Sequence, residues 1–80
     1  MAKDRPVKEQ ELARLAKKFR KAAGKSKADA ARQLGVAPPT LFAAEERPAL
    51  SLTKLRIRII EAYSPFKVVG PVFMLKEWPG

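Results

Sequence analysis

The 80-residue sequence contains no cysteine and no histidine. Without cysteine, no disulfide can staple the chain, and no thiolate can act as a nucleophile or a metal ligand. Without histidine, the chain lacks the usual general base near neutral pH and the commonest zinc ligand. No carboxylate pair in an apolar setting and no glycine-rich phosphate loop takes their place. These absences predict a protein that is not an enzyme and that binds no metal and no cofactor.

Long hydrophobic runs are also missing from the sequence. No apolar stretch approaches the roughly 18 residues that a membrane span requires, so no membrane partner is expected. The first six residues lead into a charged stretch instead of an apolar one, unlike a secretory signal. A cytoplasmic location is the expectation that follows from these observations.

Acidic residues are scarce, and basic residues are concentrated toward one end of the chain. The sequence holds 17 lysines and arginines against 8 acids, which gives a formal net charge of +9 and a pI near 10.4. Residues 1–32 carry eleven of these bases and four acids, and residues 14–27 carry seven bases and no acid. Such an asymmetry favours one electropositive surface and a polyanionic partner, of which double-stranded DNA is the first candidate.

A chain of this length is expected to form one small domain, and its apolar residues recur mainly at helical spacing. In the first segment, Leu12, Leu15, Ala16, Phe19 and Ala23 form one apolar stripe. The pattern predicts four helices, over residues 7–23, 27–34, 38–46 and 52–63.

Residues with strong conformational preferences mark the ends of these helices. Pro6 suits the entrance of the first helix, and Ser26, with Asp29 three residues later, is a good N-cap for the second. Gly35 suits a left-handed stop after the second helix. Ser51 is predicted to cap the fourth helix.

The chain from Phe66 to Leu75 changes to β-branched and aromatic residues and is predicted to form one bent strand or two short ones. We expect no other strand in the chain to pair with it, and an unpaired edge of this composition is prone to associate. Pairing with the same strand of a second copy gives the backbone groups hydrogen-bond partners, so a homodimer through the C-terminal strand is predicted. The predicted dimer contacts are Phe66, Val68, Val69, Val72, Phe73, Met74 and Leu75.

The segment from Ser26 to Tyr63 resembles the lambda-repressor-like (Cro/XRE-type) family of helix-turn-helix DNA-binding domains. The matching residues are Ala31, Leu34, Gly35 and Val36 across the turn, Thr40, Leu41 and Glu45 in the next helix, and Pro48, Leu52 and Leu55 beyond it. This resemblance implies a mostly α fold, a bundle of four to five helices with a C-terminal β-strand extension. It divides the chain into a basic N-terminal arm (residues 1–6), a helix-turn-helix domain (7–64) and a C-terminal dimerisation strand (65–80).

In that family the second helix of the pair lies in the major groove, and its early residues reach base edges. The resemblance places Pro38, Pro39, Thr40, Phe42 and Ala43 in that role. Family members usually offer groups there that hydrogen-bond to bases, whereas this helix offers mainly apolar ones. The expected phosphate contacts are Lys17, Lys21, Lys25, Ser26, Lys27, Arg32 and Arg47.

The apolar helix leaves three interpretations open. In the first, the chain is a small homodimeric repressor that binds a palindromic operator mainly through phosphates, with limited base readout through thymine methyls and Thr40. In the second, Pro38, Pro39, Phe42 and Ala43 form a protein-docking patch, as in an antitoxin that neutralises a partner protein with or without binding DNA. The strand from Phe66 to Leu75 is the other possible contact for such a partner, by β-augmentation. In the third, Phe42 folds into the core.

Overall fold

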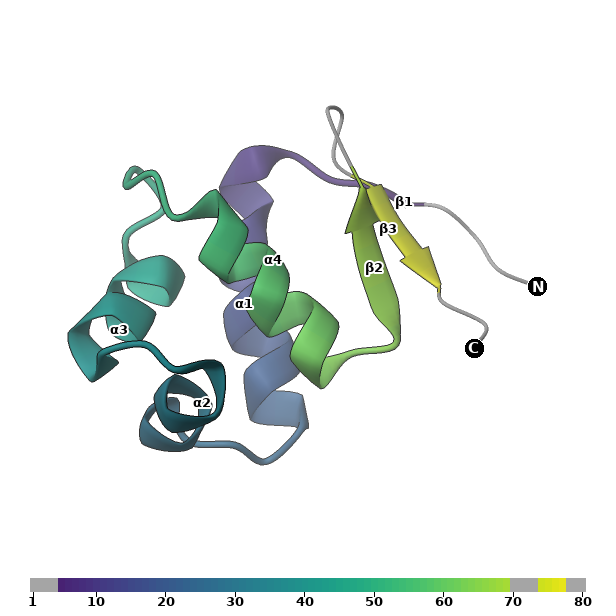
Figure 1. Ribbon diagram of the computed structural model, residues 1–80. Coiled ribbons are helices and arrows are strands. Elements are labelled where there is room, and N and C mark those ends of the chain that lie inside the picture. Colours follow the sequence, from purple (N-terminus) through teal and green to yellow (C-terminus); the bar gives the residue numbers. More distant parts are fainter. Residues whose placement is uncertain (1–4, 70–73, 78–80) are drawn as a thin grey trace.

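The computed structural model describes residues 5–69 and 74–77 (Figure 1). The helices are α1 (Glu9–Ala22), α2 (Lys27–Leu34), α3 (Pro38–Glu46) and α4 (Thr53–Tyr63), and the strands are β1 (Arg5–Pro6), β2 (Phe66–Val69) and β3 (Met74–Glu77). The prediction of a mostly helical fold with β structure at its C-terminal end is confirmed. None of the described helices has the length and apolar character needed to cross a membrane.

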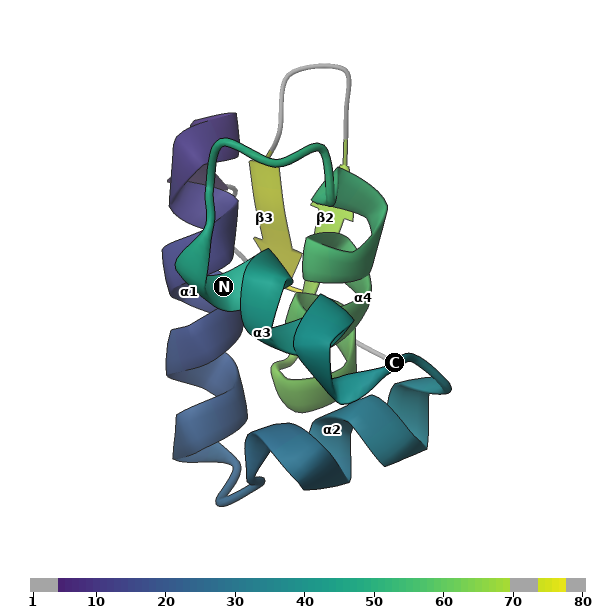
Figure 2. The ribbon, with the colours of Figure 1, turned by 90° about the vertical axis from the view of Figure 1, so that its left-hand side faces the viewer.

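The described elements pack in three layers around α1 and α4. These two helices lie side by side in the middle, with α2 and α3 on one side and the β-sheet on the other (Figures 1 and 2). Apolar side chains meet between the layers, because each element turns its apolar side toward its neighbours. The core centres on the large apolar side chains that are at most 2% exposed, namely Leu12, Leu15, Leu41, Ile59, Ile60 and Leu75.

The ends of α2 match the prediction from the sequence. Ser26 Oγ accepts a hydrogen bond from the Asp29 N–H at 3.0 Å, and the Ser26 N–H donates to the Asp29 carboxylate, which completes a capping box. Gly35 follows with a φ of +70°, a left-handed conformation that glycine adopts without the steric cost of a Cβ. The direction in which the chain leaves α2 is therefore set by local sequence.

The ends of α1 and α4 differ from the prediction in three details. Helix α1 begins two residues later than expected, because Pro6 pairs in β1 and Val7 is buried before the helix starts. Ala23, which was assigned to the apolar stripe, is exposed just beyond the last turn of α1. Ser51 does not cap α4, since the N-cap position falls on Leu52 and has no side-chain hydrogen bond.

The prediction that the C-terminal strand has no partner within the chain is wrong. β3 pairs antiparallel with both β1 and β2, so the strand order is β1–β3–β2 (Figure 1). The paired positions include Arg5 with Leu75, Pro6 with Met74 and Val68 with Leu75. A strand of two residues carries no alternating pattern, which is why the sequence did not indicate β1. Residues 5 and 6 therefore belong to the folded domain and not to a separate basic arm, while residues 1–4 lie outside the described part.

The two edges of this sheet offer few free backbone donors. On the outer edge of β2, the Phe66 N–H donates to Ser64 Oγ at 3.2 Å, and the Val68 N–H donates to Glu61 Oε2 at 3.1 Å. On the opposite edge, Pro6 of β1 has no N–H to donate. Strand addition needs a row of unpaired backbone groups, so the described edges disfavour pairing with a strand of a second copy.

Three of the residues predicted at a dimer interface contribute to the core of their own chain. Leu75 is 2% exposed, and Phe66 and Val68 pack partly against the buried cluster. This packing follows from the antiparallel pairing of β2 with β3, which turns one face of the sheet toward α1 and α4. An interface that uses Leu75 would require the core to open.

The other four predicted interface residues have different positions. Val69 is 38% exposed, and the backbone of Met74 pairs with β1 and β2. Val72 and Phe73 lie outside the described residues. An unpaired strand thus no longer supplies a reason for dimerisation, and the dimer itself stays a prediction.

Replacing Glu61 by alanine tests whether its carboxylate keeps the β2 edge closed. The variant leaves the Val68 N–H without its acceptor, so we expect faster hydrogen exchange at Val68 and stronger association than in the wild type by sedimentation velocity. Glu11→Ala, which removes an equal charge from α1, is the matched control. Unchanged exchange and sedimentation in the Glu61 variant would show that this side chain does not protect the edge.

Candidate nucleic-acid interface

Helices α2 and α3 cross each other and are joined by a tight turn over residues 35–37 (Figure 2). Two backbone hydrogen bonds close the turn, from the Val36 N–H to the Ala31 carbonyl at 3.0 Å and from the Gly35 N–H to the Arg32 carbonyl at 3.3 Å. The small Ala31 side chain is 1% exposed, and Leu41 is fully buried beneath the turn. Local hydrogen bonds and close packing therefore fix α3 relative to α2.

The outer side of α3 presents the residues that were predicted to contact bases. Pro38 and Pro39 are exposed, Thr40 and Ala43 are half-buried, and the Phe42 ring is 45% exposed. The interpretation in which Phe42 folds into the core is therefore wrong. We refer to these five residues as the α3 outer face, which is apolar apart from the Thr40 hydroxyl.

A buried ion pair fixes the inner side of α3 against α1. Arg20 Nε donates to Glu45 Oε2 at 2.6 Å, and Arg20 Nη2 donates to Glu45 Oε1 at 3.0 Å, which makes the contact bidentate. Arg20 Nη1 also donates to the Lys25 carbonyl at 2.6 Å, just beyond the end of α1. The two side chains are 7% and 0% exposed, so neither charge can lose its partner without a large penalty.

Two further arginines hold the C-terminal ends of α3 and α2. Arg56 is 1% exposed, and its Nε and Nη2 donate at 2.8 Å to the carbonyls of Ala44 and Arg47. Burial lowers the pKa of Arg56 from its usual value, although an arginine stays cationic at neutral pH. Arg58 Nη2 donates to the Leu34 carbonyl, the last of α2, at 2.7 Å. Carbonyls at helix C-termini carry partial negative charge, which these cations stabilise.

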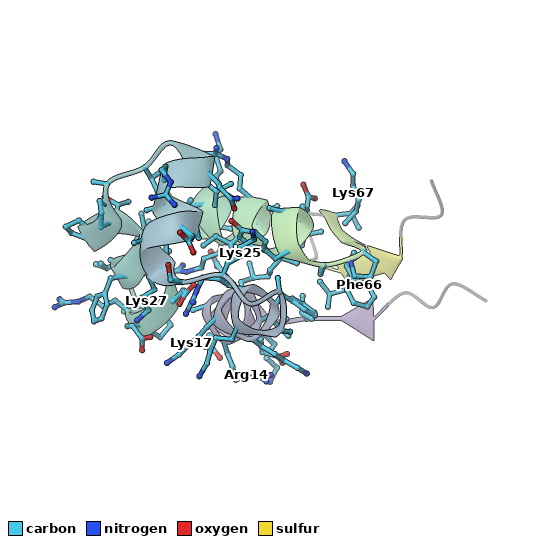
Figure 3. The ribbon with its side chains drawn as sticks, turned by 90° about the horizontal axis from the view of Figure 1, so that it is seen from below. Arg14, Lys17, Lys25, Lys27, Phe66 and Lys67 are labelled. Atoms are coloured by element: carbon cyan, nitrogen blue, oxygen red, sulfur yellow. The ribbon has the colours of Figure 1, made fainter. Side chains whose placement is uncertain are left out.

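Lys17 and Lys27, two of the predicted phosphate contacts, both pair with Glu46 of α3. Their Nζ atoms lie 2.9 Å and 3.0 Å from the same carboxylate oxygen, Oε2. The Lys27 ammonium also lies 4.4 Å from the centre of the Phe42 ring, a cation–π contact. Figure 3 shows both lysines on one side of the molecule, with Lys67 on the other. Residues 14–27 contain no acid of their own, but α3 supplies acidic partners to them.

The other predicted phosphate contacts differ in whether they already have a partner within the molecule. Lys21 and Arg47 are exposed and Lys25 is half-buried, and none of the three has an acidic partner among the described residues. Ser26 uses its hydroxyl oxygen to cap α2. Arg32 pairs at 2.6 Å with the carboxylate of the same capping box. The structure therefore leaves fewer uncommitted cations on this surface than the sequence suggested.

Two carboxylates on this surface have a lowered pKa. Hydrogen bonds from Lys17 and then Lys27 lower the pKa of Glu46. Hydrogen bonds from Ser26, followed by Arg32, lower the pKa of Asp29. A lowered pKa means that the stabilisation from these contacts is complete above the ordinary carboxyl pKa and is lost as the pH falls through the lowered value. Both groups are therefore ionised at neutral pH, and the surface carries negative as well as positive charge.

A hollow of about 590 Å³ borders the α3 outer face on the side of α4. Val36, Leu52 and Leu55 make its lining mostly apolar, and Thr40 reaches it from α3. Lys54, in the first turn of α4, adds a cation to the lining. The apolar α3 outer face therefore continues into an open, mostly apolar depression.

The arginines that hold this surface together were not predicted from the sequence. Arg20 and Arg56 lie on the apolar stripes of α1 and α4, four residues from Ala16 and Ile60 respectively. Charged residues on such a stripe indicate a buried ion pair or a contact with backbone carbonyls. The partner of Arg20 could not be identified in the same way, because Glu45 is 25 residues away along the chain.

Comparison of the chain with protein-family models, curated proteins and solved structures gives no match. Among the residues that the structure describes, no cluster of acidic side chains could hold a metal ion. The groups that this surface offers for binding are the α3 outer face, the cations around it and the Glu46 carboxylate.

Removing one partner of the buried ion pair should destabilise the fold. Glu45→Ala leaves the Arg20 guanidinium buried without a counter-ion, so the free energy of unfolding measured in urea should fall by about 3–5 kcal/mol. The double variant Arg20→Met with Glu45→Leu removes both charges and should regain most of that loss. Glu11→Ala, which removes a half-buried carboxylate with only a long ion pair to the exposed Arg14, is the control, and its effect should stay within about 0.5 kcal/mol. Equal stabilities of Glu45→Ala and Glu11→Ala would contradict a role for this pair in fixing α3.

Proposed function

We propose that the chain binds double-stranded DNA as a helix-turn-helix protein, with α3 in the major groove. The observation that carries the proposal is the placement of α3. Its outer face is exposed, while Glu45 on its inner side is held by Arg20 and its C-terminal carbonyls are held by Arg56. A helix that is rigidly held on one side and exposed on the other is the form in which proteins enter a major groove.

Phosphate contacts supply most of the affinity in this proposal. Lys21, Lys25 and Arg47 have no acidic partner among the described residues and so can neutralise phosphates without first breaking an ion pair. Base readout is limited, because the α3 outer face offers apolar groups for thymine methyls and only the Thr40 hydroxyl for hydrogen bonding. DNA shape and deformability then add to sequence preference.

We further propose that the protein is a cytoplasmic repressor that binds a palindromic operator as a homodimer. A single module of this size buries little surface on DNA, and two copies related by a twofold axis contact half-sites about 34 Å apart. Because the β2 edge is closed by Ser64 and Glu61, we place the dimer contact on exposed side chains of the sheet, such as Val69, and not on added backbone pairing.

A second candidate function, protein docking at the same surface, is favoured by a specific observation. Phe42 and Leu50 are each 45% exposed, and the hollow beside Thr40 extends the apolar surface. Exposed apolar patches commonly mark sites of protein–protein contact. In this alternative the chain neutralises a partner protein, as an antitoxin does, and contact with DNA is secondary or absent.

A salt series with a mixed-sequence duplex tests the DNA-binding proposal. If a dimer neutralises about four to eight phosphates, log affinity should fall with log salt at a slope of about −4 to −7. Lys21→Ala should reduce the magnitude of that slope by about 1 for each copy bound. Lys67→Ala, on the other side of the molecule in Figure 3, is the charge-matched control. Its slope should stay unchanged, provided that sedimentation shows the same association as for the wild type. Absence of binding at low salt, or a slope near zero, would contradict the proposal.

Phe42→Ala separates base readout from protein docking. Because the ring is 45% exposed, the variant should keep its thermal unfolding midpoint close to that of the wild type. If α3 reads bases, affinity for an operator selected from random duplexes should fall by more than the affinity for non-specific DNA. Equal losses on both kinds of DNA would contradict base readout by Phe42. A wild-type protein that selects no operator would favour the docking candidate.

A further inference from the structure

We propose that Lys17 and Lys27 form a phosphate-binding site that Glu46 occupies as an internal anion in the absence of DNA. The inference rests on the proposed DNA-binding function and identifies a residue that limits it. On binding, a DNA phosphate replaces the Glu46 carboxylate as the partner of the two ammonium groups. Glu46 therefore lowers the affinity for the phosphate backbone, the part of binding that is independent of sequence.

The two lysines surround one oxygen of Glu46 in the way that they would surround an oxygen of a bound phosphate. Lys17 comes from α1, Lys27 from the first turn of α2 and Glu46 from the last turn of α3. Both Nζ atoms meet a single oxygen of Glu46, at 2.9 Å and 3.0 Å. Two cations that converge from different helices on one oxygen can hold a phosphate oxygen in the same place.

The charge of this cluster is not balanced. Two ammonium groups share one carboxylate, so the cluster keeps a net positive charge while Glu46 is ionised. The side chains are partly open to solvent, with exposures of 41% for Lys17, 33% for Lys27 and 28% for Glu46. Ion pairs at this level of exposure are weak, so exchange of the carboxylate for a phosphate carries a small penalty.

Phe42 keeps one of the two ammonium groups in place during such an exchange. The Lys27 Nζ lies 4.4 Å from the centre of the Phe42 ring, and this contact does not involve Glu46. Phe42 and Glu46 are four residues apart on α3 and so lie on neighbouring turns of the helix. The ring can therefore keep Lys27 near its present position after the ion pair between Lys27 and Glu46 has broken.

Glu46 lies on the side of α3 that meets DNA in the proposed complex. Pro39, Ala43 and Glu46 follow the spacing i, i+4 and i+7, which places them along one stripe of the helix. A carboxylate at the end of this stripe faces the phosphates that flank the groove and repels them unless the lysines shield it. Glu45, the adjacent acid, differs because it is buried and bound to Arg20, and it has no part in this exchange.

The test compares two variants that each raise the net charge by one. Glu46→Gln frees Lys17 and Lys27, whereas Glu61→Gln neutralises an acid at the sheet end of α4 and keeps an oxygen that can accept from the Val68 N–H. Binding of both variants and the wild type to a mixed-sequence duplex is measured across a salt series. We expect Glu46→Gln to bind roughly 3- to 10-fold more tightly at low salt and to show a slope steeper by about 1 for each copy. Glu61→Gln should stay within about 2-fold of the wild type, because the Glu61 carboxylate contacts β2 and neutralising it releases neither Lys17 nor Lys27.

A second comparison ties the effect to the two lysines. In a background with Lys17→Met and Lys27→Met, Glu46→Gln should no longer make the salt slope steeper, because it has no ammonium group to release. A gain in affinity without a change in slope there reflects only the loss of repulsion between Glu46 and phosphate. Thermal unfolding midpoints identify any variant with a folding defect, and Glu46→Ala repeats the measurement with a different side chain. If the wild type binds DNA but Glu46→Gln and Glu61→Gln bind equally, the inference is wrong while the proposed function stands. If the wild type fails to bind DNA at low salt, the proposed function itself is wrong.

Discussion

The buried pair between Arg20 and Glu45 is the constraint on which the candidate interface depends. It joins the last turn of α1 to the inner side of α3, and the same guanidinium reaches the Lys25 carbonyl in the connection to α2. One side chain thereby links α1, the connection between α1 and α2, and α3. A charge in this position requires its partner, because a buried guanidinium without a counter-ion is strongly unfavourable. The orientation of α3 follows from that requirement together with the tight turn after α2.

The net charge of +9 is therefore a poor measure of the charge available to a partner. Arg20 and Arg56 are buried and bind a carboxylate or backbone carbonyls inside the molecule. Lys17 and Lys27 are engaged by Glu46. The remaining exposed cations determine how strongly a polyanion is attracted at long range. Cations that already pair with a carboxylate must give up that contact before they can bind the polyanion.

Much of the helical part of the fold could be predicted because its signals are local. The capping box at Ser26, the left-handed Gly35 and the buried Leu41 are each set by residues within one or two turns. The sheet could not be predicted in the same way, because β1 is too short to show a pattern and pairs with β3 near the other end of the chain. The seven large apolar residues between positions 66 and 75 indicated strand structure, which β2 and β3 confirm, but not which backbone groups would pair with it.

The candidate site was predictable only in outline. The sequence placed Pro38, Pro39 and Phe42 on an exposed helix face, and the structure has them exposed. It could not indicate that Glu46 meets Lys17 and Lys27, since those contacts join residues on three different helices. Nor could composition show that the outward N–H groups of β2 are taken by Ser64 and Glu61. Long-range pairing of charges and of backbone donors is determined by the fold and leaves no periodic signal in the sequence.

The most direct test of the account is to follow backbone and side-chain amide signals of the isotope-labelled protein during titration with a mixed-sequence DNA duplex. The account predicts that signals from the start of α2, from Thr40 to Glu46 and from the Arg47 loop shift together, while those of β2 and β3 stay in place. Shifts confined to the sheet, or no shifts at low salt, would contradict the placement of the DNA-binding surface on α3.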